Sequence, residues 1–353
     1  MESPETTVAG DRAAGLRLRF GAAFAGRAAR GTTAPVARRV LPPAQARRRA
    51  GAIGDPLFHT VSLAFALSVL GLAAVVGVVL WRWSAASRAA FGWSFLATST
   101  WDPVFSRFGA LPFVWGTLAT SAIALAIAIP LGVGAAICLA ELVPRSTGDA
   151  LAFLVELLVA VPSVIYGLVG LFVLVPLVRT AGGAVARALG SVPLFAGPVY
   201  GIGLLTAGLL LAFMTVPFIV AISREVLLAV PETQRDAALA LGATRWETVR
   251  HAVLPYARTG ILGSVFLALA RALGETMAVT MVIGNRPEIA ASLFAPAHTM
   301  AAVLANEFSE AAGDLYLSAL MEIALVLFGI TIVVNAGARL LIARVRAPAG
   351  APA

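Results

Sequence analysis

Two opposite charges, Arg271 and Glu275, stand four residues apart inside a long apolar run of the sequence. A charged side chain at bilayer depth is unfavourable by several kcal/mol unless it is paired or faces a water-filled cavity. On a continuous helix, this spacing places the two side chains one above the other on the same face. The pattern favours a buried polar site on a transport path. The alternative is a structural ion pair that holds helices together.

The elements that position these charges are apolar and long. The chain of 353 residues is 59% hydrophobic and only 12% charged, whereas soluble domains average about 25% charged residues. Six stretches could cross the roughly 30 Å of hydrocarbon in a bilayer. They predict an all-α membrane protein with spans at 57–80, 113–140, 151–177, 198–222, 258–284 and 315–338. Arginines concentrate on alternate connections, which predicts that both termini are cytoplasmic.

The segment before the first span is strongly basic. Residues 1–55 contain ten arginines and four acidic residues, and they carry most of the net charge of +8. Their Ala-, Gly- and Pro-rich composition predicts a disordered tail that lies on anionic membrane lipid. No nucleic-acid-binding motif accompanies the arginines, so no nucleic-acid partner is expected. Residues 56–345 are predicted to form the transmembrane permease domain, and 346–353 a short C-terminal tail.

Several chemistries are not expected on this chain. All 26 basic residues are arginine, and a P-loop needs a lysine for the nucleotide phosphates. ATP-driven transport would therefore require an ATPase on another polypeptide, and no cofactor is expected here. The single cysteine, Cys138, excludes an internal disulfide, and three widely separated histidines predict no metal site. No catalytic constellation is visible, so the chain is not expected to be an enzyme.

The longest predicted inner loop, residues 223–257, has the pattern of two helices joined by a turn. Pro231 suits the first turn of a helix, and acidic residues that include Asp236 complement the dipole near that end. Gly242 ends or turns this helix, and a second helical stretch leads to Pro255. Small residues before Gly242 would let the loop dock closely on a partner. The alternative is an amphipathic surface loop.

This loop resembles the EAA loop of ABC-transporter permeases, whose pattern is E-A-A-x3-G-x9-I-x-L-P. Two positions depart from the pattern, because Asp stands in place of Glu and Ala252 in place of Ile. The resemblance implies that the loop is a coupling helix that docks on an ATPase subunit. The matching residues, and hence the predicted coupling residues, are Asp236, Ala237, Ala238, Gly242, Leu254 and Pro255.

Three further stretches, 156–170, 223–231 and 271–285, resemble the C-type permease subunit of the phosphate importer, the PstC family. The likeness covers most of residues 57–340, and its last stretch is the most specific. It implies a type I ABC importer permease fold in the bacterial inner membrane, with inorganic phosphate as substrate. The implied partners are a related A-type permease subunit, two ATPase subunits and an extracytoplasmic phosphate-binding protein.

The resemblance gives the two intramembrane charges specific roles. Arg271 would offer its planar guanidinium to phosphate. Glu275 would accept a hydrogen bond from a phosphate O–H and repel sulfate, which lacks that proton; alternatively, it only neutralises Arg271. Candidate wall residues, each of which could instead serve helix packing, are Thr276, Thr280, Ser163 and Tyr166. Other functions left open are an ABC permease for molybdate or sulfate, and a non-ABC secondary transporter that would need no docking loop.

Overall fold

The computed structural model describes residues 54–346, and the predicted tails fall almost entirely outside this range. The chain divides into two units, residues 1–69 and residues 70–353. The first unit contributes the beginning of helix α3 (Gly54–Trp83), which is predominantly apolar. The described part contains six helices that are long and apolar enough to span a membrane. The predicted all-α, six-span fold class is therefore confirmed.

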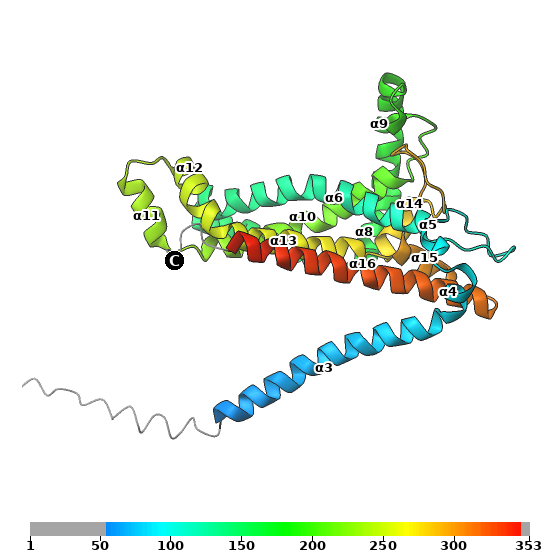
Figure 1. Cartoon of the computed structure of the whole chain (residues 1–353). Coiled ribbons are helices and arrows are strands. Elements are labelled where there is room, and N and C mark those ends of the chain that lie inside the picture. The colour runs from blue at the N-terminus through cyan, green and yellow to red at the C-terminus, as the bar shows by residue number, and fades with distance from the viewer. Residues whose placement is uncertain (1–53, 347–353) are drawn as a thin grey trace, which may run out of the picture. The chain divides into compact units, whose positions relative to one another are not determined.

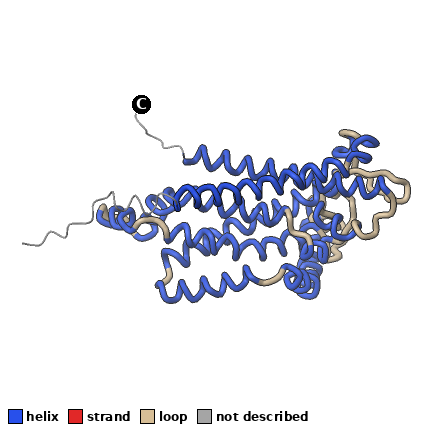
Figure 2. The backbone as a smooth tube through the Cα atoms, turned by 90° about the horizontal axis from the view of Figure 1, so that it is seen from below, coloured by secondary structure: helices blue, strands red, loops and turns tan. Residues whose placement is uncertain are grey.

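The second unit is a bundle of long helices whose loops gather mainly at one end (Figures 1 and 2). Strands are absent from residues 54–346. In a bilayer, backbone groups must bond within their own segment, which selects helices. After α3, the helices are α4 (Ala85–Phe91), α5 (Ser94–Ala97), α6 (Leu111–Ile137), α7 (Arg145–Ala160), α8 (Ser163–Val169), α9 (Val175–Leu189), α10 (Leu204–Leu228), α11 (Glu232–Ala240), α12 (Arg245–Thr248), α13 (Leu254–Leu273), α14 (Met277–Ile283), α15 (Met300–Glu307) and α16 (Asp314–Arg346).

Helices α6 and α10 form the centre of the bundle and lie side by side (Figure 1). Glycines permit this close approach: a Cβ at Gly208 would come within 2.5 Å of Ile123, and one at Gly132 within 2.8 Å of Ile219. Threonines on both helices bond back to carbonyls one turn earlier, as Thr215 does to Leu211. These hydroxyls are thereby satisfied inside an apolar core.

The third predicted span, 151–177, is interrupted. Helix α7 ends at Ala160, Val161 is extended with ψ 129°, and α8 begins at Ser163. The cause is Pro162, because proline disfavours the helical conformation of the residue before it. The membrane-length helix begins after this break and runs Ser163–Leu189. Helix α9, at its end, turns away from the bundle (Figure 1).

The two ends of the bundle differ. Helices α11 and α12 lie at one end, called here the coupling end; helices α4, α5, α14 and α15 lie at the opposite end (Figure 1). An ion pair between Arg224 and Asp149 joins the last turns of α10 to the start of α7 near the coupling end. At the opposite end, Phe95, Phe113 and Leu320 belong to one buried cluster. The candidate site lies at the break between α13 and α14, toward the end opposite the coupling end (Figure 1).

Candidate functional site

The fifth predicted span, 258–284, is broken where its two charges lie. Helix α13 ends at Leu273, and α14 begins at Met277. Gly274 follows α13 with φ −96° and ψ 0°, outside helical geometry. The expectation that Arg271 and Glu275 stand one above the other on a continuous helix is therefore wrong. Broken membrane helices are tolerated where they are buried in protein or line a cavity.

Arg271 lies in the last turn of α13 and is half-buried. Its Nε is buried and has no hydrogen-bond partner among the described residues. The guanidinium carbon lies 5.7 Å from the ring centroid of Phe218, at cation–π distance. Arg271 takes part in none of the ion pairs that the described residues form. It is therefore a cation in the last turn of a candidate membrane span, and the described residues supply no carboxylate to compensate its charge.

Within the described part of the chain, Glu275 caps the start of α14 and forms no ion pair with Arg271. Its Oε1 accepts a hydrogen bond from the backbone N–H of Ala278, at 3.3 Å. This bond satisfies one of the free N–H groups in the first turn of α14, where a negative charge is also favourable. The carboxylate thus stabilises the start of the helix that follows the break. A sequence pattern based on one continuous helix could not indicate this capping role.

The other predicted wall residues lie near the break or on α8. Thr276 bonds to the carbonyl of Gly274 at 3.2 Å, and Thr280 bonds to that of Thr276 at 2.7 Å. On α8, Ser163 is half-buried, and the Tyr166 hydroxyl donates to the carbonyl of Leu158 at 2.6 Å. Two threonines and the tyrosine therefore have hydroxyl protons engaged by the backbone. Among the four candidate wall residues, Ser163 alone has a hydroxyl without a hydrogen bond to another part of residues 54–346.

An open groove of about 610 Å³ borders the break. Gly274 and Thr276 form one edge of it, and α15 and α16 form the other. Its walls are mainly small and apolar, so an anion passing along it would meet few competing hydrogen-bond acceptors. The remaining lining residues are Ala301, Leu304, Ala305, Phe308, Ser309, Met321, Ala324 and Leu327.

The predicted coupling loop begins after Leu228, because α10 extends beyond the expected end of its span. Helix α11 ends at Ala240, and Gly242 has φ +88°, a left-handed conformation that glycine adopts without strain. The predicted turn at Gly242 is confirmed. Asp236 and Ala237 are exposed on α11, and Ala238 is half-buried.

The second helix of the loop does not stop at Leu254–Pro255. A π-helical turn, Val249–Val253, joins α12 directly to α13, and Pro255 lies in the first turn of α13. Pro255 has no backbone N–H to donate within this continuous helix, and the π-helical turn directly before it is an irregularity that can accommodate the missing bond. A movement of the loop therefore has a continuous helical path, Arg245–Leu273, to the turn that carries Arg271.

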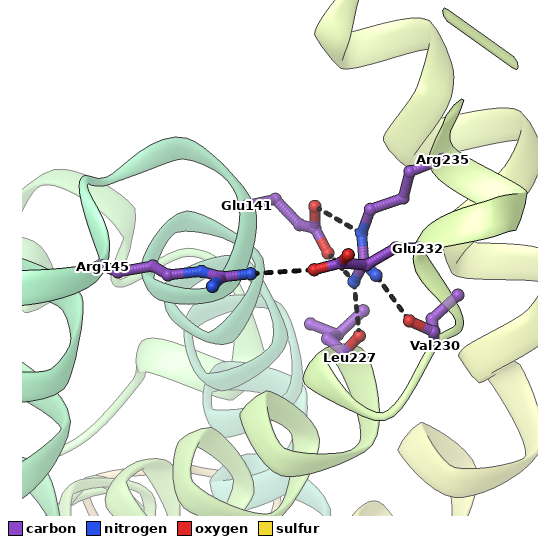
Figure 3. Close-up of polar contacts among 6 residues, drawn as sticks. All are labelled: Glu141, Arg145, Leu227, Val230, Glu232 and Arg235. Carbon is purple, nitrogen blue, oxygen red and sulfur yellow. Dashed lines mark hydrogen bonds and ion pairs between the residues drawn. The ribbon is translucent and has the colours of Figure 1, made fainter. Parts of the chain in front are cut away.

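Two ion pairs tie α11 to the segment that joins α6 and α7, and the sequence patterns indicated neither (Figure 3). Arg235 makes a bidentate contact with Glu141, at 2.7 Å and 3.3 Å, and also donates to the carbonyls of Leu227 and Val230. The second pair, Arg145–Glu232, spans 3.1 Å. The side chains of Glu141 and Arg235 are only 10% and 19% exposed, whereas Glu232 and Arg145 are 76% and 89% exposed. An acidic residue at the end of a span is the one sequence signal for the buried pair.

Comparison with known proteins identifies the family. Residues 128–347 match the family described as binding-protein-dependent transport system inner membrane component. The phosphate transport system permease protein PstC of Mesorhizobium japonicum is 48% identical over 305 residues, which cover 85% of this chain and 93% of that protein. The PstC of Haemophilus influenzae is 44% identical, over 84% of this chain and 95% of that protein.

The chain belongs to the PstC family. A solved structure of the MetNI methionine ABC transporter, 18% identical, covers 66% of this chain and 94% of its own chain with a TM-score of 0.50. That likeness concerns the fold alone, which is that of an ABC importer permease. As a PstC-family permease, the chain is a multi-pass component of the inner membrane and belongs to a transporter with further subunits. The predicted resemblance is confirmed.

Proposed function

We propose that this chain is a membrane permease subunit that carries inorganic phosphate across the inner membrane in an ATP-driven ABC importer. The observation that carries the substrate is the close relationship, over more than four-fifths of the chain, to proteins named as phosphate transport system permeases. Molybdate and sulfate are the competing substrates. A secondary transporter is disfavoured by the membership of residues 128–347 in a binding-protein-dependent family.

We propose four partner subunits and the membrane itself as the surroundings of the chain. A related A-type permease would close the open groove from the other side, and an extracytoplasmic phosphate-binding protein would deliver the anion. Two ATPase subunits would bind and hydrolyse ATP, so this chain would hold no cofactor. Helix α11 is largely exposed, and Leu241, the residue directly after it, is 90% exposed. This exposure supports the proposal that α11 docks on one ATPase subunit.

Arg271 is proposed to contact phosphate at the break. Its uncompensated guanidinium and buried Nε suit an oxyanion, since charge-assisted hydrogen bonds form in planar pairs. The contact must be transient, because the ion has to leave. Thr276, Thr280, Ser163 and Tyr166 remain candidate wall residues, of which Ser163 has the freest hydroxyl.

Glu275 is proposed to provide selectivity. The Ala278 N–H donates to one carboxylate oxygen, and the other oxygen remains free to accept a hydrogen bond from a phosphate O–H. Sulfate near neutral pH has no such proton, so the same carboxylate would repel it. Glu275→Gln is expected to keep the cap of α14, because the amide oxygen still accepts the Ala278 N–H, and to admit sulfate.

The experiment is labelled phosphate uptake by cells that depend on this chain and its partner subunits, with sulfate and molybdate as competitors. Wild-type uptake should resist both competitors, and Glu275→Gln should become sensitive to sulfate. If sulfate or molybdate suppressed wild-type uptake of labelled phosphate as strongly as unlabelled phosphate does, phosphate would be rejected as the specific substrate. Unchanged sulfate rejection in Glu275→Gln would remove only the selectivity role. Loss of uptake in Gly242→Asp, with assembly retained, is expected from the coupling loop.

A further inference from the structure

A second pocket, of about 390 Å³, lies at the end of the bundle opposite the coupling end. It is formed by the end of α3, by α4 and the turn after it, and by the first half of α16, all within residues 70–353. Helices α4 and α16 are side by side there (Figure 1). The Ser318 hydroxyl fixes their contact by accepting the Ser87 N–H and donating to the Trp83 carbonyl. The pocket is lined by Trp81, Arg88, Gly92, Trp93, Leu96, Glu322, Leu325 and Val326.

Glu322 is the unusual member of this pocket. Its side chain is on a membrane-spanning helix and is only 6% exposed, yet its Oε2 has no hydrogen-bond partner among the described residues. The buried hydroxyl of Ser87, on α4, is also without a partner there. Buried polar groups in folded proteins are almost always hydrogen-bonded, and an intramembrane carboxylate is a functional-site candidate by default. The Ser87 hydroxyl lies close to the Glu322 carboxyl and can donate to it, but Oε2 itself has no partner among the described residues, and a donor from outside the chain would satisfy it.

Arg88 faces the same pocket and is held rigidly. Its guanidinium carbon lies 3.7 Å from the Trp81 ring centroid, its Nε donates to Ser84 at 3.1 Å, and its Nη2 donates to the Trp81 carbonyl. Its Nη1 has no recorded partner among residues 54–346 and is left for a ligand. Arg88 and Glu322 form no direct ion pair among the described residues, although the charge of Arg88 acts on the Glu322 carboxyl. Both groups line the same pocket, so one ligand could contact both.

The walls between these charges are apolar and partly open. Trp81 and Trp93 are 56% and 88% exposed, and the pocket surface is completed by Leu96, Leu325 and Val326. Tryptophans gather at membrane–water interfaces, where their rings lie at headgroup level. A ligand here would place a polar group between Arg88 and Glu322 and apolar chains against the surrounding side chains.

We propose that this pocket binds a phospholipid whose headgroup carries both a phosphate and a primary ammonium, as in phosphatidylethanolamine. The Arg88 guanidinium would donate hydrogen bonds to the phosphate, and the three N–H groups of the ammonium would donate to Glu322 and Ser87. An anionic lipid such as phosphatidylglycerol offers hydroxyl donors but no positive charge, so it would bring a second negative charge near Glu322 without a cation to balance it. A choline headgroup has no N–H donor for either acceptor. A metal ion is a poor fit, because one carboxylate and an apolar wall supply too few ligands.

The test is lipid titration of the delipidated, full-length complex, followed by native mass spectrometry. Phosphatidylethanolamine, its N,N-dimethyl form, phosphatidylcholine and phosphatidylglycerol are compared. We expect affinity to fall with each loss of N–H donors, by at least about tenfold from phosphatidylethanolamine to phosphatidylcholine, and phosphatidylglycerol to bind as weakly. This series needs no mutation, so it remains decisive even if a pocket variant fails to fold.

Variants then assign the selectivity to the pocket. Glu322→Gln should abolish the preference for phosphatidylethanolamine, and Arg88→Gln should weaken every phospholipid. The matched control, Glu310→Gln, changes an exposed carboxylate near the same end of the bundle and should keep the wild-type preference. Equal affinity for phosphatidylethanolamine and phosphatidylglycerol, or an unchanged preference in Glu322→Gln, would overturn the proposal.

Discussion

The ion pair between Glu141 and Arg235 offers a sharp test of how the coupling loop is held. It joins α11 to the π-helical turn that follows α6, with the two side chains 10% and 19% exposed. Removing one partner of a buried pair leaves an uncompensated charge and destabilises by about 3–5 kcal/mol. Arg235 retains some solvent, so we expect the low end of that range for Glu141→Gln, about 3 kcal/mol.

That loss should appear as local opening of the loop rather than global unfolding. A difference of about 3 kcal/mol shifts an opening equilibrium by roughly two decades, at about 1.4 kcal/mol per decade. Hydrogen exchange of the α11 amides in the assembled complex measures this shift. We therefore expect exchange in α11 to accelerate roughly a hundredfold in Glu141→Gln. Uptake should fall with it if a docked loop transmits the work of the ATPase.

The neighbouring pair supplies a matched control in the same loop. Arg145 and Glu232 are 89% and 76% exposed, and exposed pairs contribute no more than about 1 kcal/mol. Glu232→Gln should therefore change exchange by less than about fivefold. The double variant Glu141→Gln, Arg235→Gln should be less damaged than the sum of its single variants, since the two effects are coupled. Equal exchange in Glu141→Gln and Glu232→Gln would refute the reasoning.

Three further predictions concern single residues. Burial lowers the pKa of His298 from 6.5 to about 4. The stability that the neutral imidazole contributes is full above pH 6.5 and is lost as pH falls toward 4, by about 3 kcal/mol. The melting temperature should therefore fall with pH across this range, and His298→Gln should reduce that fall. Gly116→Ala should lower stability by about 3 kcal/mol, because its Cβ would lie 2.0 Å from the His298 carbonyl oxygen, whereas Gly134→Ala, with no atom within 4 Å, should have little effect in the same melts. Gly242→Ala should cost about 1 kcal/mol, because φ is +88° there, and faster amide exchange confined to α11 would report it.

The spans were largely predictable from the sequence because hydrophobic length is a direct consequence of bilayer thickness. Breaks within them were less so. A hydropathy profile does not detect the helix breaks at Pro162 and Gly274, because both lie inside apolar runs. The orientation of the termini and the properties of the predicted tails remain predictions, since the described residues do not bear on them.

The site was predictable in part. Arg271 stands out in any apolar run, and Gly242 has the expected turn. The expected stacking of Arg271 and Glu275 on one continuous helix was wrong, because α13 ends at Leu273 and Glu275 caps α14. The Glu141–Arg235 pair joins residues 94 positions apart, and no local pattern indicates such a contact. Tertiary packing alone brings them together.

The central claim is that the uncompensated guanidinium of Arg271 binds the transported anion. The most direct measurement is initial-rate phosphate uptake by reconstituted complexes that carry Arg271→Gln, with Arg107→Gln in an exposed loop as the matched loss of charge. Loss of a charge-assisted contact, about 1.5–3 kcal/mol, predicts uptake at least tenfold below wild type for Arg271→Gln and unchanged uptake for Arg107→Gln. Wild-type uptake in Arg271→Gln would contradict the account.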